Sequence, residues 1–118
     1  MASFMLLLHR SPERYREATA SGHTVGDITR EYIDWADRTR AKGQLKGGSK
    51  LTDDAGKILR TSAGRLSTTD GPYVESKEIV GGYFLISAGD YAEACRIAGD
   101  CPHLKYGSHI EVRQVEEL

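Results

Sequence analysis

The chain has 118 residues, 39% of them hydrophobic and 28% charged, which fits one globular domain over residues 1–118. Its formal net charge is -1, so the protein has no excess of positive charge with which to attract nucleic acid or an anionic membrane, and we expect neither partner. The cysteines, Cys95 and Cys101, form no CxxC or Cys/His pattern, and no GxGxxG or P-loop motif is present. We therefore expect no metal and no cofactor, with Cys95 buried and Cys101 at a boundary.

The apolar run Phe4-Met5-Leu6-Leu7-Leu8 begins the predicted elements. Five residues before His9 and Arg10, with no basic region in front, are too few for a signal-peptide core or a membrane span. We interpret residues 4–9 as a buried strand and expect a cytoplasmic protein. Residues 10–22 are polar, and Ser11-Pro12-Glu13 favours a short helical turn that ends at Gly22.

The clearest helix is predicted over residues 24–42. Thr24 and Asp27 have the spacing of a capping box, and Gly43 can supply a left-handed C-cap. Apolar side chains recur at helical spacing between these ends. They are Val25, Ile28, Tyr32, Trp35 and Ala36.

Residues 44–69 are divided by glycine and aspartate into three short strand candidates, 44–52, 57–61 and 65–69, which we expect to be connected as hairpins. A strand follows over 79–87. Asp90-Tyr91-Ala92-Glu93 opens a second helix that ends at Gly99 and Pro102, and a final strand contains Ile110, Val112 and Val115.

This order of elements predicts an α+β fold, a ferredoxin-like βαββαβ sandwich with extra hairpin strands. Two helices can cover only one face of such a sheet, and the other face should then be polar. The segments Phe4-Met5-Leu6-Leu7-Leu8 and Tyr83-Phe84-Leu85-Ile86 are nevertheless apolar on both faces. We therefore predict a homodimer whose sheets pack face to face.

The densest polar segment is Asp70-Gly71-Pro72-Tyr73-Val74-Glu75-Ser76-Lys77-Glu78, followed by Gly81-Gly82. One interpretation is a solvated turn. The other is a loop that fixes Asp70 and Tyr73 at the mouth of a cavity, with Lys77 and Glu78 close by to bind a ligand. Asp70 could act there as a base, or its hydrogen bonds could be purely structural.

This segment, with the strand Tyr83-Phe84-Leu85-Ile86 after it, resembles the signature of the YCII-related proteins, in particular their DGPF-domain branch. The final segment from Tyr106 to Val115 is similar to the closing strand of that family. Tyr73 stands where the branch usually has phenylalanine. The resemblance implies a dimeric ferredoxin-like α/β barrel with a cavity between sheet and helices, in a superfamily that includes muconolactone isomerases and small monooxygenases.

The resemblance also implies candidate catalytic residues. YCII-related proteins have been proposed as enzymes on the strength of a His/Asp pair, whose histidine lies on the first long helix; Tyr32 occupies that place here. Tyr32 could be a hydrogen-bond donor or a core tyrosine, and His9, at the end of the first strand, is the best substitute histidine. We expect a cofactor-independent enzyme or small-molecule binder near Asp70. The alternative is a regulatory protein associated with an extracytoplasmic-function sigma factor, as DGPF proteins often are.

Overall fold

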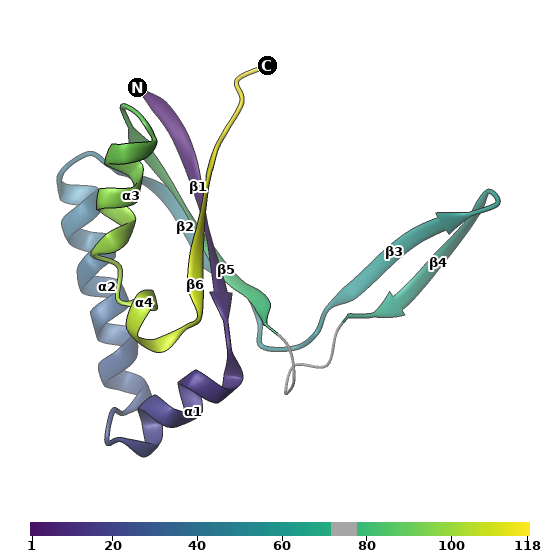
Figure 1. Ribbon diagram of the computed structural model, residues 1–118, viewed down its shortest axis with the longest axis horizontal. Coiled ribbons are helices and arrows are strands. Elements are labelled where there is room, and N and C mark those ends of the chain that lie inside the picture. Colours follow the sequence, from purple (N-terminus) through teal and green to yellow (C-terminus); the bar gives the residue numbers. More distant parts are fainter. Residues whose placement is uncertain (72–77) are drawn as a thin grey trace.

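The computed structural model describes residues 1–71 and 78–118. Four antiparallel strands form the main sheet in the order β2-β5-β1-β6 (Figure 1). They are β1 (Ala2–Arg10), β2 (Leu45–Lys50), β5 (Ile79–Ala88) and β6 (His109–Gln114). With the central hairpin set aside, this is the strand order of a ferredoxin-like sandwich, and the predicted fold class is confirmed.

Four helices accompany the sheet: α1 (Pro12–Ala20), α2 (Val25–Ala41), α3 (Tyr91–Gly99) and α4 (His103–Tyr106). The caps read from the sequence are present, because Thr24 and Asp90 accept hydrogen bonds from the backbone N–H groups of Asp27 and Glu93. Gly43 follows α2 with φ of 73°, as its predicted capping role requires. Helix α4 was not predicted, because four residues are too few to show an apolar period.

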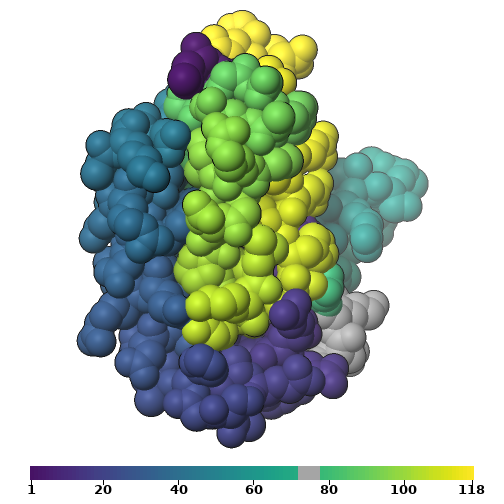
Figure 2. Space-filling view, turned by 60° about the vertical axis from the view of Figure 1, so that its left-hand side comes forward, coloured from purple at the N-terminus to yellow at the C-terminus, as the bar shows by residue number. Residues whose placement is uncertain are grey.

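Helices α2 and α3 lie side by side over one face of the sheet (Figures 1 and 2). Phe4 and Leu6 of β1 and Ile86 of β5 are completely buried on that face, against Trp35 of α2 and Ala94 of α3. Successive side chains of a strand point to opposite faces, so Met5, Leu7, Tyr83 and Leu85 point away from the helices. These four are only half-buried.

Two expectations about the middle and end of the chain were wrong. The segment at 44–52 does not form a hairpin with its neighbour, because β2 pairs with β5 in the main sheet. Only β3 (Lys57–Ser62) and β4 (Arg65–Asp70) form a hairpin, a separate two-stranded sheet that projects from the body (Figure 1). The cysteines are also reversed: Cys95 is exposed and Cys101 is buried. The reason is that α3 turns Ala94, Ile97 and Ala98 inward and Cys95 outward.

Within the described residues, no helix combines the length and the apolar character needed to cross a membrane.

Candidate functional site

A cavity of about 490 Å³ lies between the sheet and α2. Strands β1, β2 and β5 supply one wall, α2 supplies the opposite wall, and residues of α1 and α4 also line the cavity. Much of the lining is apolar or aromatic. The apolar and aromatic side chains are Leu8, Tyr15, Val25, Ile28, Tyr32, Ile33, Ala36, Phe84 and Tyr106.

Glycines on the two neighbouring strands make room for the cavity. A Cβ added to Gly48 would lie 2.5 Å from the Phe84 ring and 2.7 Å from the Tyr83 carbonyl oxygen. A Cβ added to Gly82 would lie 2.9 Å from the Ser49 carbonyl oxygen. Larger residues at these positions would push the strands or the Phe84 ring out of place. With glycine there, no side chain extends from the sheet into the cavity at these two positions.

Arg10 faces the same cavity because it lies two residues after Leu8 on β1, and its side chain packs on a β-bulge at Gly81 of β5. Leu8 pairs with Gly82 and His9 with Val80, so Gly81 is the extra residue on β5. The Arg10 side chain lies across it, and a Cβ on Gly81 would be 2.9 Å from Cδ of Arg10. The Gly81-Gly82 pair noted in the sequence therefore serves close packing, and both Leu8 and Arg10 face the cavity.

Tyr32 of α2 and His103 of α4 meet inside this cavity. The Tyr32 hydroxyl lies 2.8 Å from Nδ1 of His103, and Nε2 of His103 lies 2.6 Å from the backbone carbonyl oxygen of His9. The ring is held tightly, because a Cβ on Gly107 would overlap its Cε1, Nε2 and Nδ1 atoms. Only glycine at position 107 leaves space for this ring.

The two hydrogen bonds fix the tautomer of the neutral imidazole. A carbonyl oxygen can only accept, so Nε2 of His103 carries the proton and donates it to His9. Nδ1 is then a lone pair that accepts from the Tyr32 hydroxyl. Burial lowers the pKa of His103 below 6.5, and the hydrogen bond to the His9 carbonyl opposes this effect. The lowered pKa favours the neutral imidazole.

The pKa of Tyr32 is raised, so its hydroxyl keeps its proton at neutral pH. Burial is the main cause; Cys101, Tyr106 and Tyr15 add to the rise, and the positive charge of Arg10 opposes it. Burial also raises the pKa of the Cys101 thiol to about 11, so this cysteine is no thiolate nucleophile. The pair at Tyr32 and His103 thus combines a protonated donor with a neutral base.

The predicted substitute histidine, His9, takes part through its backbone. Its carbonyl holds His103, whereas its side chain belongs to the opposite face of the sheet, where Nε2 lies 3.1 Å from Oε1 of Glu111. There its ring stacks on His109 with a centroid separation of 4.4 Å. Among the described residues, no group of three or more His, Cys, Asp or Glu side chains is arranged to hold a metal ion.

Sequence reasoning missed His103 as the partner of Tyr32. A signal for it exists in the predicted topology: β6 runs antiparallel to β1, so the segment before β6 must lie beside the end of β1. His103 is in that segment, in the short helix α4. No periodicity marks a four-residue helix, and its histidine looked like any other.

The remaining predicted residues lie elsewhere. Asp70 ends β4 on the projecting hairpin, where its carboxylate is 2.5 Å from Nζ of Lys57 and its side chain is 80% exposed. Glu78 accepts a hydrogen bond from the Ser108 hydroxyl and lies 3.4 Å from Nδ1 of His109. Tyr73 and Lys77 lie outside the described residues. Neither Asp70 nor Glu78 lies beside Tyr32, and the catalytic role of Asp70 stays a prediction.

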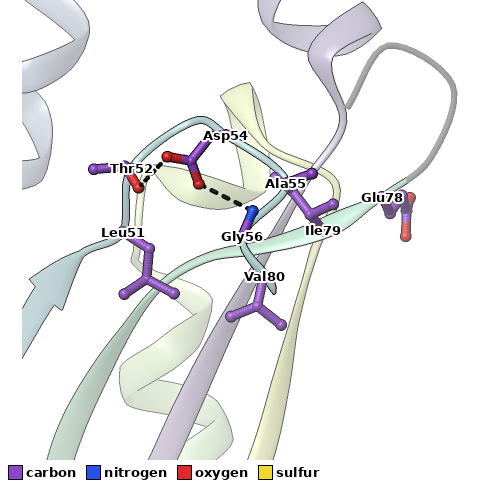
Figure 3. Close-up of a pocket in the computed structure, with 8 residues that line it drawn as sticks. All are labelled: Leu51, Thr52, Asp54, Ala55, Gly56, Glu78, Ile79 and Val80. Carbon is purple, nitrogen blue, oxygen red and sulfur yellow. Dashed lines mark hydrogen bonds between the residues drawn. The ribbon is translucent and has the colours of Figure 1, made fainter. Parts of the chain in front are cut away.

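A second cavity, of about 410 Å³, lies beside the loop between β2 and β3 (Figure 3). Its polar groups are already engaged: Asp54 accepts hydrogen bonds from the Thr52 hydroxyl and from the Gly56 backbone N–H. Glu78 is far to one side of Asp54 in Figure 3, so the two carboxylates do not form a pair. We therefore take the cavity with Tyr32 and His103 as the candidate site.

Strand order and cavity together define a ferredoxin-like α+β protein with a site between sheet and helices. A family model for the YCII-related domain matches residues 2–118, so the chain belongs to the YCII-related family. The resemblance read from the sequence is confirmed at this level. Membership in the DGPF branch stays a prediction, since most of that motif lies outside the described residues.

Among solved structures, the chain is similar in fold to 5-chloro-2-hydroxyhydroquinone dehydrochlorinase from Burkholderia phenoliruptrix AC1100, in complex with 2,5-dihydroxybenzoquinone. The TM-score is 0.56 at 11% sequence identity, and the match covers 98% of this chain and 95% of that chain. No curated protein matches the sequence significantly.

Proposed function

We propose that the chain is a cofactor-independent enzyme that binds a small ring compound in the cavity between the sheet and α2, and that Tyr32 and His103 move a proton on it. The observation that carries the proposal is the chain of hydrogen bonds from Tyr32 through His103 to the His9 carbonyl, placed in a largely apolar cavity. Titratable side chains that line a cavity, are hydrogen-bonded to each other and have shifted pKa values are typical of catalytic sites.

The proton movement balances without any further group. A bound molecule gives a proton to the Tyr32 oxygen while the Tyr32 hydroxyl proton passes to Nδ1 of His103. The imidazolium then holds one proton on each nitrogen, and Nε2 still donates to the His9 carbonyl. Reversal returns the proton to another atom of the bound molecule, as in a keto–enol shift.

The lining of the cavity indicates the type of molecule. Val25 and Ile33 of α2 are 60% and 54% exposed although both are apolar and line the cavity. Exposed apolar side chains at a cavity are typical of a binding site. The dehydrochlorinase of similar fold holds a hydroxylated quinone, which supports a compact ring as a ligand for this architecture; at 11% identity that likeness extends to the fold alone.

The proposed enzyme is a homodimer. Met5, Leu7, Tyr83 and Leu85 leave an apolar band on the sheet face opposite the helices, and a second copy of the same face is complementary to it. The role of a sigma-factor partner rests on the sequence resemblance alone and stays a prediction.

The test of the proposed function uses Tyr32→Phe, which removes the hydroxyl and keeps the ring. Tyr91→Phe is the matched control, because the Tyr91 hydroxyl also takes part in a hydrogen bond, which it accepts from the Gln114 backbone N–H, and its side chain is 47% exposed. Exchange of the α-hydrogens of cyclohexanone in deuterated water is followed by NMR. We expect faster exchange with the natural protein and with Tyr91→Phe, and the uncatalysed rate with Tyr32→Phe. Equal rates for all three proteins contradict the proposal.

A further inference from the structure

Three charged side chains meet at one end of the cavity. The Arg10 guanidinium Nη1 and the Lys50 Nζ each lie 2.8 Å from the same oxygen, Oδ1 of Asp53. All three residues line the cavity that holds Tyr32 and His103. The Arg10 side chain is only 19% exposed, and its guanidinium lies 5.9 Å from the centre of the Tyr15 ring.

Within residues 1–71 and 78–118, Arg10 and Lys50 share the single carboxylate of Asp53, so these three side chains together carry a net charge of +1. Removing a guanidinium from water costs free energy, and Gly81 leaves the room that the Arg10 side chain occupies, since a Cβ there would lie 2.9 Å from Cδ of Arg10. Arg10 also acts on Tyr32, since its positive charge is one of the influences on that hydroxyl. The positive end of the cavity and the proton-moving pair therefore belong to one space.

Asp53 lies in the loop between β2 and β3, whereas Arg10 and Lys50 end strands of the main sheet. The side chains of Asp53 and Lys50 are 62% and 73% exposed, and that of Arg10 is mostly buried. The Asp53 carboxylate has the charge and shape of the group that such a pair of cations would bind from a ligand. Rotation of one exposed side chain would release Arg10 and Lys50.

We propose that the ligand of this cavity is a ring compound bearing a carboxylate, which binds Arg10 and Lys50 in place of the Asp53 side chain. The proposal rests on the proposed function and names its substrate class. The planar guanidinium can bind both oxygens of a carboxylate. The ring then lies along the glycine-lined wall near Phe84, toward Tyr32.

The test compares benzoate with benzamide, which has the same shape and no charge. Binding to the natural protein is measured by calorimetry, and we expect benzoate to bind about tenfold more tightly, the effect of one charge-assisted hydrogen bond. Arg10→Gln is expected to remove this preference. Arg60→Gln, on the exposed hairpin strand β3, is the matched control and should keep it. Arg10→Lys retains the charge without the planar fork and should give an intermediate preference.

Asp53→Asn provides an independent arm. If the Asp53 carboxylate competes with the ligand, its removal tightens benzoate binding severalfold, leaves benzamide binding unchanged and makes benzoate binding more sensitive to salt. Weaker benzoate binding in Asp53→Asn contradicts the proposal that the ligand carboxylate replaces the Asp53 side chain, because Asp53 would then be needed to position Arg10.

The outcomes separate this inference from the proposed function. If benzoate and benzamide bind equally, while Tyr32→Phe still abolishes the hydrogen exchange of cyclohexanone, the cavity is the site and the carboxylate class is wrong. If neither compound binds at millimolar concentration and the natural protein does not speed the exchange, the proposed function and the inference are both wrong. Thermal unfolding of each variant shows whether it is folded before binding is measured.

Discussion

The Tyr32 hydroxyl lies 2.8 Å from Nδ1 of His103, although the two residues are 71 positions apart in the chain. Helix α2 brings the first residue over the sheet, and the short helix α4 brings the second to the end of β1. Because Nε2 of His103 donates to the His9 carbonyl, the orientation of the ring is fixed by backbone as well as by Tyr32.

Gly107→Ala is expected to dislodge the His103 ring, because the added Cβ would overlap three of its atoms. The buried ring would lose both hydrogen bonds, and we expect a loss of unfolding free energy of about 2–4 kcal/mol together with loss of catalysis. Gly99→Ala is the control, since a Cβ there meets nothing within 4 Å. Urea unfolding measures both variants. Equal stability of Gly107→Ala and the natural protein would show that the ring does not occupy this position.

Acid should destabilise the protein through His103. Its pKa in the folded state lies below 6.5 because the ring is buried, while the unfolded chain takes up the proton near 6.5. The unfolded state therefore binds more protons between 6.5 and the lower folded value, and unfolding free energy falls as the pH decreases through that window. Urea unfolding from pH 8 to pH 5 should show a smaller decrease in His103→Gln than in the natural protein. His23→Gln, at an exposed position, should leave the decrease unchanged.

Gly81→Ala should move the Arg10 side chain and leave the fold intact. The nearest atoms to the added Cβ are Cδ and Cγ of Arg10, at 2.9 and 3.2 Å, and a flexible side chain can yield. We expect a stability change under about 1 kcal/mol, the usual range for a strained but adaptable contact, and loss of the preference for benzoate over benzamide. Gly47→Ala, with nothing within 4 Å of its Cβ, is the matched control in β2. If Gly81→Ala still prefers benzoate over benzamide, the contact between Gly81 and Arg10 is not needed to position the guanidinium for the ligand.

Leu7→Glu should separate the proposed homodimer into monomers. Leu7 lies opposite Tyr83 and Glu111 in the middle of the uncovered sheet face, so a charge there would be buried between two copies. Leu59→Glu makes the same chemical change on the projecting hairpin, where the side chain is 61% exposed, and should leave the dimer unchanged. Sedimentation at micromolar concentration measures the mass. A monomeric natural protein would overturn the dimer.

Asp70→Asn distinguishes the sequence prediction from the site found in the structure. The Asp70 side chain is 80% exposed and paired with Lys57, so we expect stability to change by less than about 0.5 kcal/mol. Because the described contacts of Asp70 are on the hairpin, we expect ligand affinity to change less than twofold. A clear loss of affinity without unfolding would instead support the role that the sequence suggested for Asp70. Asp37→Asn, in an exposed ion pair with Arg40, is the control.

Much of the architecture is readable along the chain because it depends on local chemistry. The apolar run from Phe4 to Leu8 specifies β1, and a cap at Thr24 with apolar residues at helical spacing specifies α2. The order of elements then restricts the fold to a ferredoxin-like sandwich, because few topologies connect them without crossing. The cavity between the sheet and the helices was implied by the resemblance to the YCII-related proteins.

Tertiary structure decided which residues face that cavity. The pairing of β2 with β5, the contact of Arg10 with the bulge at Gly81 and the meeting of Tyr32 with His103 all join residues at least 30 positions apart, and they depend on strand register. A shift of one residue in register would turn every strand side chain to the opposite face, and no local pattern fixes where a bulge occurs. The sequence alone thus determined the fold, because local patterns and the order of elements specify it, and the three-dimensional packing selected Tyr32, His103 and Arg10 as polar groups of the cavity.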